Sequence, residues 1–387
     1  MKATFGTVVC FLLAIVLLGV LFFALPDHPF SEQENRALQT RPPLSFRSAL
    51  SGKFTASVND WYADQFPCRD GLVGIKGVAE LALGKGENNG ILLGKDGQLA
   101  KRLFDIRHSD GTITEQTDAI DPEPLLRAAA GVNRAAENAN VPTVFLFPGR
   151  TLDLAASSFS YPVTEEPIRI FRSALSPTVC APDVITPLRE AFERGEPVTF
   201  RTDHHWTSAG AYYAYIQVME SLGMKEDILP LSRFQKKVVS ETFYGTFWSA
   251  AGFKSVRPDR VELFFFGNEG DFTVTEDDAV RQGLYRQEAL AGKDHYLIFP
   301  GATYDVVTIT KAGNESRPRL LVAKDSFANS LVPFLAQHFD IVMINLSSAH
   351  RDFTDLTAFS EAYHADAVLV VYTFSNILEA DVLPRLK

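Results

Sequence analysis

The hydrophobic and polar positions divide the chain into an apolar N-terminal run, a polar segment, and a long region in which apolar strands alternate with helices. Phe5 to Leu25 is nearly continuous apolar sequence and contains no charged residue. In a helix, about 20 residues cross the ~30 Å hydrocarbon core of a bilayer. We therefore expect residues 5–25 to form a transmembrane signal anchor and residues 1–4 to form a short cytoplasmic tail.

The alternative for this apolar run is a cleaved signal peptide. The apolar part of a signal peptide usually has about 7–15 residues and ends before small residues at the cleavage site. This run is longer, and it ends in FFALP at residues 22–26, so we favour an uncleaved anchor. Lys2 favours a cytoplasmic N-terminus, whereas Arg36 and Arg41 lie near the other end of the run and oppose that orientation.

Residues 26–85 are predicted to form a stalk followed by membrane-proximal helices. The first half of this segment is rich in proline and polar residues. Apolar residues then recur at helical spacing over residues 54–62 and again over residues 72–83, with Pro67 between the two runs. The glycine-rich residues 84–97 follow, and we expect them to form turns around a short hairpin.

Residues 86–387 are predicted to form one α/β domain, because short apolar strands alternate with helices from about residue 123 onward. The expected helices span residues 123–139, 207–222 and 327–338. The expected strands span residues 141–147, 184–185, 198–201, 319–323, 341–345 and 367–372. Residues 225–295 lose the alternation and are predicted to form a β-rich insertion. Continuous apolar strands that alternate with helices indicate a mostly parallel sheet covered on both faces, which is the three-layer α/β class.

The composition indicates a folded protein and excludes several classes of partner and scaffold. The chain has 387 residues, a formal net charge of −10 and 46% hydrophobic residues, which fits a folded protein. Binding to nucleic acid needs clustered lysine and arginine, so we predict no nucleic-acid partner. Three cysteines exclude a disulfide-stapled scaffold and a structural zinc ribbon. Cys10 lies in the apolar run, and a bridge between Cys68 and Cys180 is left open.

Two of the predicted strands end in residues that carry catalytic chemistry. Ligands of such sheets bind beyond the carboxyl ends of the strands. Asp203, His204 and His205 follow one predicted strand, and Ser326 follows another just before a helix. A serine becomes a nucleophile when a histidine takes its proton and a carboxylate orients that histidine, and the N–H groups of a helix's first turn stabilise an oxyanion. The pattern therefore predicts acyl transfer at a Ser-His-Asp site.

Two other interpretations of these residues stay open. A serine before a helix is most often an N-cap, and adjacent histidines beside an aspartate also suit a metal ion. Only eight histidines occur, and no second H-x-H, H-x-x-x-H or H-x-x-E-H cluster completes a coordination sphere. The metal interpretation is therefore the weaker one, and no metal site is predicted.

Several segments resemble motifs of one family. The string Asp203-His204-His205-Trp206 resembles the name-giving motif of the DHHW family, which is similar to the SGNH-type hydrolases and to the alginate O-acetylation proteins AlgJ and AlgX. The other matching segments are Glu34 to Arg36 with Pro42-Pro43, Asp64 to Asp70, and Lys324 to Asn329. These matches cover most of the chain outside the apolar run. The resemblance implies an SGNH-hydrolase-like sheet and a site on the extracytoplasmic side.

The resemblance implies roles residue by residue. Ser326 would be the nucleophile, His205 the general base, and Asp203 the carboxylate that orients the base. His204 would not be the base, because the second position of the motif varies in those relatives, and its role is left open. The pair of Asp203 and His205 precedes the serine in sequence, which matches the order found in the AlgJ and AlgX group.

The residues expected to stabilise the oxyanion match the family less closely than the triad does. Relatives often carry a glycine-rich G-G-N-like turn whose asparagine donates to the oxyanion. The corresponding stretch here, residues 296–304, keeps a glycine but has Ala302 and Thr303 where that asparagine would stand. Candidates for oxyanion or substrate contacts are Gly301, Asn329, Tyr244 and Trp206. For Trp206, packing against the site is favoured over stacking on a sugar.

The resemblance implies a membrane-anchored extracytoplasmic O-acetyltransferase that acts on a cell-surface or secreted polysaccharide through an acetyl-serine intermediate. It implies a single-pass location in the cell membrane, a membrane-bound O-acyltransferase partner that supplies the acetyl group, and no bound cofactor. An acetyl esterase with the same triad and a non-catalytic polysaccharide-binding or scaffold protein are the alternatives. Transfer and hydrolysis differ in acceptor binding and in the exclusion of water, which the residue types alone do not decide.

Overall fold

A computed structural model describes residues 2–31, 36–102, 105–107, 113–115, 121–161, 163–302, 304–313, 316–348 and 350–387. These residues form two compact units. The first unit comprises Met1–Asn88 and Trp248–Ser255, and the second comprises Asn89–Phe247 and Val256–Lys387. Both turns that carry candidate catalytic residues belong to the second unit.

The first unit begins with an apolar helix, α1 (Lys2–Ala24). Its segment Phe5–Ala24 has a mean hydropathy of 3.0, and nearly all of its side chains are exposed. In the described part of the chain, this is the one helix that is long and apolar enough to cross a membrane. The predicted N-terminal apolar helix is therefore confirmed, and it fits a signal anchor as well as a signal peptide.

The rest of the first unit consists of short elements: β1 (Phe30–Ser31), β2 (Arg36–Ala37), α2 (Phe46–Leu50), α3 (Lys53–Asp64), α4 (Arg69–Ala82) and β3 (Glu87–Asn88). The two predicted helices are present as α3 and α4, and they are separated at Pro67. Hydrogen bonds connect the C-terminal end of α3 to the polar segment that precedes α2. Asp64 Oδ2 accepts a hydrogen bond from Gln39 N (2.8 Å), and Gln65 Nε2 donates one to His28 O (2.9 Å).

An eight-stranded sheet forms the centre of the second unit, in the order β13-β12-β14-β16-β15-β17-β8-β9. Its strands are β8 (Thr143–Leu146), β9 (Val179–Cys180), β12 (Phe272–Glu276), β13 (Ala279–Gln282), β14 (Val306–Lys311), β15 (Arg319–Lys324), β16 (Asp340–Asn345) and β17 (Ala367–Val371). The pairs from β16 to β9 are parallel, and those from β13 to β16 are antiparallel. Every residue of β17 is buried, as expected for a parallel strand covered on both faces.

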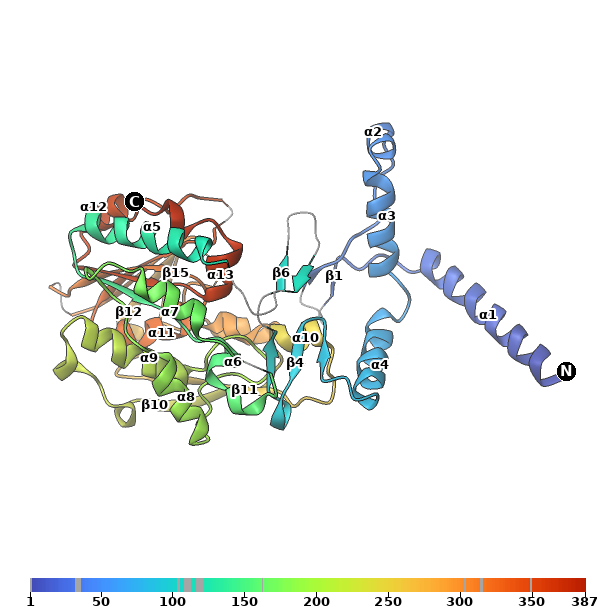
Figure 1. The fold of residues 1–387 in the computed structure, drawn as a ribbon, viewed down its shortest axis with the longest axis horizontal. Coiled ribbons are helices and arrows are strands. Elements are labelled where there is room, and N and C mark those ends of the chain that lie inside the picture. Colours follow the sequence, from blue (N-terminus) through green and yellow to red (C-terminus); the bar gives the residue numbers. More distant parts are fainter. Residues whose placement is uncertain are drawn as a thin grey trace. The chain divides into compact units, whose positions relative to one another are not determined.

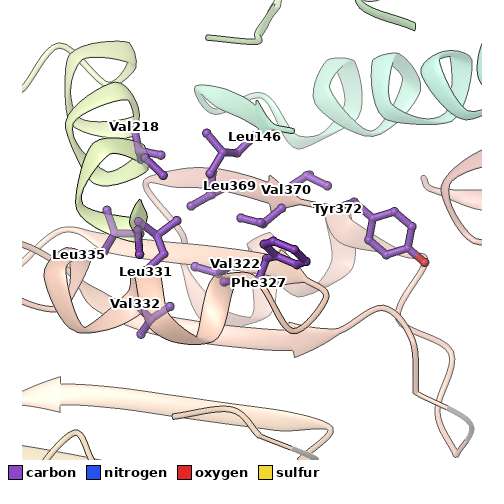
Figure 2. Close-up of a cluster of buried hydrophobic side chains, with 14 of the residues drawn as sticks. Leu146, Val218, Val322, Phe327, Leu331, Val332, Leu335, Leu369, Val370 and Tyr372 are labelled. Atoms are coloured by element: carbon purple, nitrogen blue, oxygen red, sulfur yellow. The ribbon is translucent and has the colours of Figure 1, made fainter. Parts of the chain in front are cut away.

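Helices cover both faces of this sheet (Figure 1). One face carries α5 (Glu123–Ala139), α12 (Leu356–Tyr363) and α13 (Phe374–Glu379), and the other carries α9 (Ser208–Ser221) and α11 (Ala328–Leu335). Figure 2 shows part of the core, with buried side chains from β8, β15, β17, α9 and α11. The predicted mostly parallel, three-layer α/β class is therefore confirmed.

The remaining helices and strands after residue 88 are β4 (Ile91–Leu93), β5 (Leu99–Lys101), β6 (Asp105–Arg107), β7 (Ile113–Glu115), α6 (Thr151–Leu154), α7 (Glu166–Ser173), α8 (Ile185–Glu193), β10 (Gln235–Phe243), α10 (Thr246–Ala251) and β11 (Asp259–Phe265). β4 and β5 pair as the short antiparallel hairpin expected in the glycine-rich segment. Cys10, Cys68 and Cys180 are free, exposed thiols in the structure.

Two of the predicted strands are wrong. Residues 184–185 belong to the start of α8, because the carboxylate of Asp183 accepts hydrogen bonds from Ile185 N (3.0 Å) and Thr186 N (3.3 Å) and so favours a helix start. Residues 198–201 form no strand but contribute one bridge, between Thr199 and Trp206. In both places the apolar run is too short for its periodicity to distinguish a strand from other buried backbone.

The predicted insertion at residues 225–295 is β-rich, but only part of it stands apart from the sheet. β10 and β11 pair with each other, whereas β12 and β13 extend the main sheet at its antiparallel edge. Residues of β12 are alternately buried and half-buried, which is the pattern of an antiparallel strand with one covered face. This alternation differs from the continuous apolar runs that indicated the parallel strands, so the antiparallel half of the sheet was missed.

Candidate active site

His205, the predicted base, and Asp203, its carboxylate, lie on a tight turn that is held by a residue from another segment of the chain. The bridge between Thr199 and Trp206 closes this turn. Asp259, at the start of β11, accepts hydrogen bonds from Arg201 N (2.8 Å), Thr202 N (2.7 Å) and Thr202 Oγ1 (2.6 Å). These bonds satisfy backbone groups that have no strand partner and hold the turn in one conformation.

Ser326 lies on the turn between β15 and α11, as the sequence predicts. The carboxylate of the preceding Asp325 is buried and accepts hydrogen bonds from Phe327 N (3.1 Å), Thr373 N (2.6 Å) and Asn376 Nδ2 (2.9 Å). Burial raises the pKa of Asp325, and these hydrogen bonds oppose the increase. The carboxylate thereby fastens the turn to the chain that follows β17, while Ser326 itself remains half-exposed.

The three predicted catalytic side chains form one hydrogen-bonded line. His205 Nε2 lies 2.7 Å from Ser326 Oγ, and His205 Nδ1 lies 2.5 Å from Asp203 Oδ1. Asp203 Oδ2 accepts hydrogen bonds from Thr246 N (2.8 Å) and Thr246 Oγ1 (3.0 Å). Burial alone would raise the pKa of Asp203, but His204, His205 and these hydrogen bonds hold that pKa well below its usual range. Asp203 is therefore ionised, and it favours the tautomer that leaves Nε2 free to accept the serine proton.

Two aromatic rings hold the imidazole of His205 in place. The ring of Tyr296 stacks on it with a centroid separation of 3.7 Å and an interplanar angle of 10°, and the ring of Phe327 lies 4.8 Å away. The Tyr296 hydroxyl also donates to Ser326 O (3.0 Å), so one residue supports the base and the serine turn together. The roles of Tyr296 and Thr246 could not be predicted from the sequence, because both depend on contacts between segments far apart in the chain.

His204 is a neighbour of the triad's carboxylate. Its Nδ1 lies 2.7 Å from Thr246 Oγ1 and 3.5 Å from Asp203 Oδ1. Burial and then repulsion from His205 lower the pKa of His204, and water moderates the effect of burial because 36% of the side chain is exposed. His204 bonds to Thr246, whereas His205 contacts Ser326, which agrees with the expectation that His204 is not the base.

The same residues also bear on the metal interpretation. Each of Asp203, His204 and His205 offers one possible ligand atom, and these three atoms lie within 4.8 Å of one another. However, Asp203 Oδ1 and both ring nitrogens of His205 already take part in the line that ends at Ser326. A metal ion would have to break these hydrogen bonds, so the geometry fits a catalytic triad better than a metal site.

Two of the predicted oxyanion residues lie close to each other and to the serine. Gly301 has a φ of +85°, and a Cβ at this position would lie 3.1 Å from Asn329 Oδ1. Asn329 N donates to Ser326 O (3.2 Å), and Asn329 Oδ1 is buried without a hydrogen-bond partner in the described residues. The buried Lys324 holds the glycine turn, since its Nζ donates to Gly301 O (2.9 Å). Thr303, in the same stretch, lies outside the described residues.

The other two candidates lie elsewhere around the triad. Trp206 is fully buried, and its Nε1 donates to Phe327 O (3.1 Å) and Ser330 Oγ (2.9 Å), so it packs beneath the site and has no free face for a sugar. Tyr244 directly precedes Gly245, which adjoins the triad's carboxylate. The role of Tyr244 in oxyanion or substrate contacts stays a prediction.

A pocket of about 340 Å³ is lined by Ser326. Its wall presents hydroxyl, amide, imidazole and carboxylate groups, contributed by Asp305, Asn345, Ser347, Ser348, His350 and Asn376. A polar pocket that includes the predicted nucleophile is a natural place for a hydroxyl-bearing substrate.

A larger hollow of about 600 Å³ lies over β10 and contains a second serine–histidine pair. Ser240 Oγ lies 2.7 Å from His295 Nδ1. This serine also accepts a hydrogen bond from Thr242 N (3.2 Å), and in the described residues no carboxylate bonds to His295. The pair thus lacks an orienting group, and the pocket at Ser326 is the stronger candidate for the active site.

One family model matches the part of the chain that contains this site. Residues 179–345 match the family model described as DHHW protein, and this range contains both turns of the candidate triad. The resemblance to the DHHW family that the sequence predicted is therefore confirmed. Glu34 and Asn35, which resemble the family's membrane-proximal motif, lie outside the described residues.

A curated relative is the probable alginate O-acetylase AlgJ of Pseudomonas syringae pv. tomato, which is 25% identical over 187 residues. That match covers 46% of this chain and 45% of AlgJ, so the chain spans less than half the length of the curated relative it matches.

Two solved structures share the fold. A DHHW family protein from Eubacterium siraeum has a TM-score of 0.56 at 20% identity, with 76% of this chain and 97% of that chain covered. PatB1 of Bacillus cereus, solved with a sulfonyl adduct, has a TM-score of 0.59 at 20% identity, with 77% of this chain and 98% of that chain covered. These likenesses show that the chain shares the α/β fold of both proteins.

Proposed function

We propose that this protein is a serine-dependent O-acyltransferase that moves an acetyl group onto a hydroxyl of a cell-surface or secreted polysaccharide. The observation that carries this proposal is the hydrogen-bonded line from Asp203 through His205 to Ser326. In such a line the histidine activates the serine, and the ionised carboxylate stabilises the imidazolium that forms. The class of reaction is supported by the relative named as a probable alginate O-acetylase.

The first half-reaction loads the serine. Ser326 Oγ attacks the carbonyl carbon of an acetyl ester while His205 Nε2 takes the hydroxyl proton, and the carbonyl oxygen becomes an oxyanion. Gly301, Asn329 and the N–H of Ser326 are the groups that we assign to stabilising this oxyanion. The bond to the donor's ester oxygen then breaks, that oxygen takes the proton from His205, and acetyl-Ser326 remains.

The second half-reaction transfers the acetyl group. A hydroxyl of the acceptor attacks the carbonyl of acetyl-Ser326 and gives its proton to His205 Nε2. The bond to Ser326 Oγ then breaks, and the serine regains its proton from His205. The products are the acetylated acceptor and the free serine, and Asp203 stays ionised throughout. No step requires a bound cofactor.

We further assign α1 as the membrane anchor, with the second unit on the extracytoplasmic side. The length and apolarity of Phe5–Ala24 support this assignment. An acetyl group used on that side must first cross the membrane. The proposal therefore includes a membrane-bound O-acyltransferase as the partner that supplies it.

An acetyl esterase is the second candidate function. Ser326 is half-exposed and its pocket is polar, so water can compete with a sugar hydroxyl for acetyl-Ser326. A non-catalytic scaffold is less well supported, because a scaffold has no need for the orientation of His205 that Asp203 and Tyr296 provide.

One experiment separates these functions. The purified full-length protein in detergent is mixed with p-nitrophenyl acetate and an excess of a neutral oligosaccharide such as mannohexaose. We expect acetylated oligosaccharide to form faster than free acetate, measured by mass spectrometry of the oligosaccharide and an acetate assay. Free acetate as the only product would identify an esterase, and the absence of both products would leave the scaffold interpretation.

Replacing Gly245 by alanine is expected to disable the triad while the fold survives. A Cβ at this position would lie 2.3 Å from both Cβ and Oδ2 of Asp203, so the carboxylate must move away from His205. A displacement of about 1 Å in such a site costs about 100-fold in rate, and we expect a loss of that order in kcat with p-nitrophenyl acetate.

The matched control for this variant is Gly71→Ala in α4. Nothing lies within 4 Å of the Cβ added at that position, and alanine favours a helix, so we expect unchanged activity and equal or greater stability. A G245A protein that is as active as G71A would show that the position of Asp203 does not matter for the reaction.

A further inference from the structure

We infer that the pocket at Ser326 accepts an uncharged, hydroxyl-rich sugar, and that Asp305 excludes sugars that carry a carboxylate. The inference rests on the proposed function and names the acceptor class of that same site. It stands on three features of the pocket: the hydrogen-bonding groups on its wall, the balance of its charges, and one carboxylate that pairs with no described residue.

The pocket wall offers both donors and acceptors to a ligand. Asn345 Oδ1 accepts a hydrogen bond from Ser347 N (3.1 Å), while its amide N–H groups bond to no described residue. Asn376 Nδ2 donates to Asp325 Oδ2 (2.9 Å), while the side-chain oxygen Oδ1 of Asn376 bonds to no described residue. A sugar hydroxyl both donates and accepts, so this mixture of groups suits a hydroxyl-rich ligand.

The charges on the pocket wall leave one negative charge without compensation. Lys324 and Asp325 are both buried, and they interact electrostatically. Burial lowers the pKa of Lys324 to about 8, and Asp325 opposes the decrease, so Lys324 stays mostly protonated at pH 7 and balances Asp325. The remaining carboxylate is that of Asp305, whose side chain makes no ion pair or hydrogen bond with any described residue.

Nearby arginines do not compensate this charge. Arg286 lies over the ring of Tyr304, next to Asp305 in sequence, but its guanidinium is paired with Glu276. Arg351 follows His350 and lies over the ring of Phe353. Lys324 is therefore the one lysine or arginine in the described lining of the pocket.

A single unpaired carboxylate in a pocket of about 340 Å³ has two effects on an acceptor. It accepts hydrogen bonds from sugar hydroxyls, and it repels another carboxylate, because like charges at short range repel each other. The formal net charge of −10 acts in the same direction by lowering the local concentration of a polyanion. A uronic acid polymer such as alginate therefore fits this pocket less well than a neutral glycan.

The test compares three matched acceptors with the full-length protein in detergent and p-nitrophenyl acetate as the donor. Mannohexaose is neutral, hexamannuronate has the same sugar backbone with a carboxylate on each residue, and methyl-esterified hexamannuronate has the carboxylates masked. We expect transfer to mannohexaose and to the methyl ester to be at least about tenfold faster than to hexamannuronate.

The variant Asp305→Asn tests the residue itself. It removes the repelling charge and keeps the size of the side chain, so we expect the ratio of methyl-ester to uronate rates to fall to about threefold or less. The ratio is taken within each variant, so a general change in rate cancels. Glu361→Gln, at an exposed position of α12, removes one negative charge elsewhere and should leave the ratio as in the wild type.

Four outcomes decide the matter. The expected ratios in the wild type and D305N support the inference. Equal or faster transfer to hexamannuronate, or an unchanged ratio in D305N, overturns it. Acetyl-Ser326 that forms but passes its acetyl group to none of the three acceptors also overturns it, while the nucleophile stands. Failure to form acetyl-Ser326 at all is different, because it removes the proposed function and this inference with it.

Discussion

Replacing Ser326 by alanine is expected to abolish acetyl transfer, with kcat falling by about 1000-fold or more. Alanine removes the oxygen that forms the acyl intermediate and leaves Nε2 of His205 without its partner at 2.7 Å. The anchored turn and the contacts of Asp325 do not depend on the serine hydroxyl, so the fold should be preserved. Release of p-nitrophenol from p-nitrophenyl acetate, together with the mass of the acceptor, measures the effect.

The matched control is Ser173→Ala at the end of α7. Ser173 is a serine on an exposed helix end whose hydroxyl bonds only locally, to Ile170 O (2.9 Å). We expect this variant to keep wild-type activity and a wild-type circular dichroism spectrum, and S326A to keep the spectrum alone. An S326A protein that transfers acetyl groups within tenfold of the wild type would exclude Ser326 as the nucleophile.

Replacing Asp203 by asparagine should be nearly as damaging, with a loss of about 10,000-fold in kcat, as for an orienting carboxylate in comparable triads. Every hydrogen bond that Asp203 makes is accepted by it, from His205 and from Thr246. An amide NH₂ group at the same position faces donors, and the histidine responds by adopting the other tautomer. Its Nε2 then carries a proton and cannot act as the base.

Proton NMR of the histidine rings gives a readout that loss of stability alone would not produce. The wild type should show a low-field resonance from the His205 Nδ1 proton that is shared with Asp203 at 2.5 Å, and D203N should lose it while the dispersion of the spectrum remains. The activity of D203N should recover partly with rising pH as hydroxide replaces the base. A D203N protein that retains both the resonance and the rate would remove Asp203 from the triad.

Much of the fold and the core of the site could be predicted from the sequence. The parallel strands β8, β15, β16 and β17 are continuous apolar runs, and the helix at Glu123–Ala139 has the predicted bounds. The position of chemistry at strand ends follows from the sheet class alone. Ser326 follows this rule at the end of β15, but the turn that holds His205 follows no strand of the sheet. The two turns nevertheless meet at the contact between His205 and Ser326, which are separated by more than a hundred residues of sequence.

The rest could not be predicted because it depends on long-range contacts. Thr246 bonds to Asp203 from 43 residues further along the chain, Tyr296 stacks on His205, and Asp259 anchors the turn from β11. The sequence marks none of these contacts. The antiparallel strands β12 and β14 alternate in burial and so differ from the continuous runs that revealed the others. Similarly, whether Asp305 has a partner is a property of the folded pocket and not of the sequence around it.

The central claim is that Ser326 carries the acetyl group. The most direct measurement is mass spectrometry of the full-length protein quenched in acid during turnover of p-nitrophenyl acetate without acceptor, followed by peptide mapping. We predict a protein heavier by one acetyl group, with the modification on the peptide containing Ser326, and its loss when mannohexaose is added before quenching. An acetyl group found on any other residue, or a protein that turns over the ester with Ser326 unmodified throughout, would contradict the account.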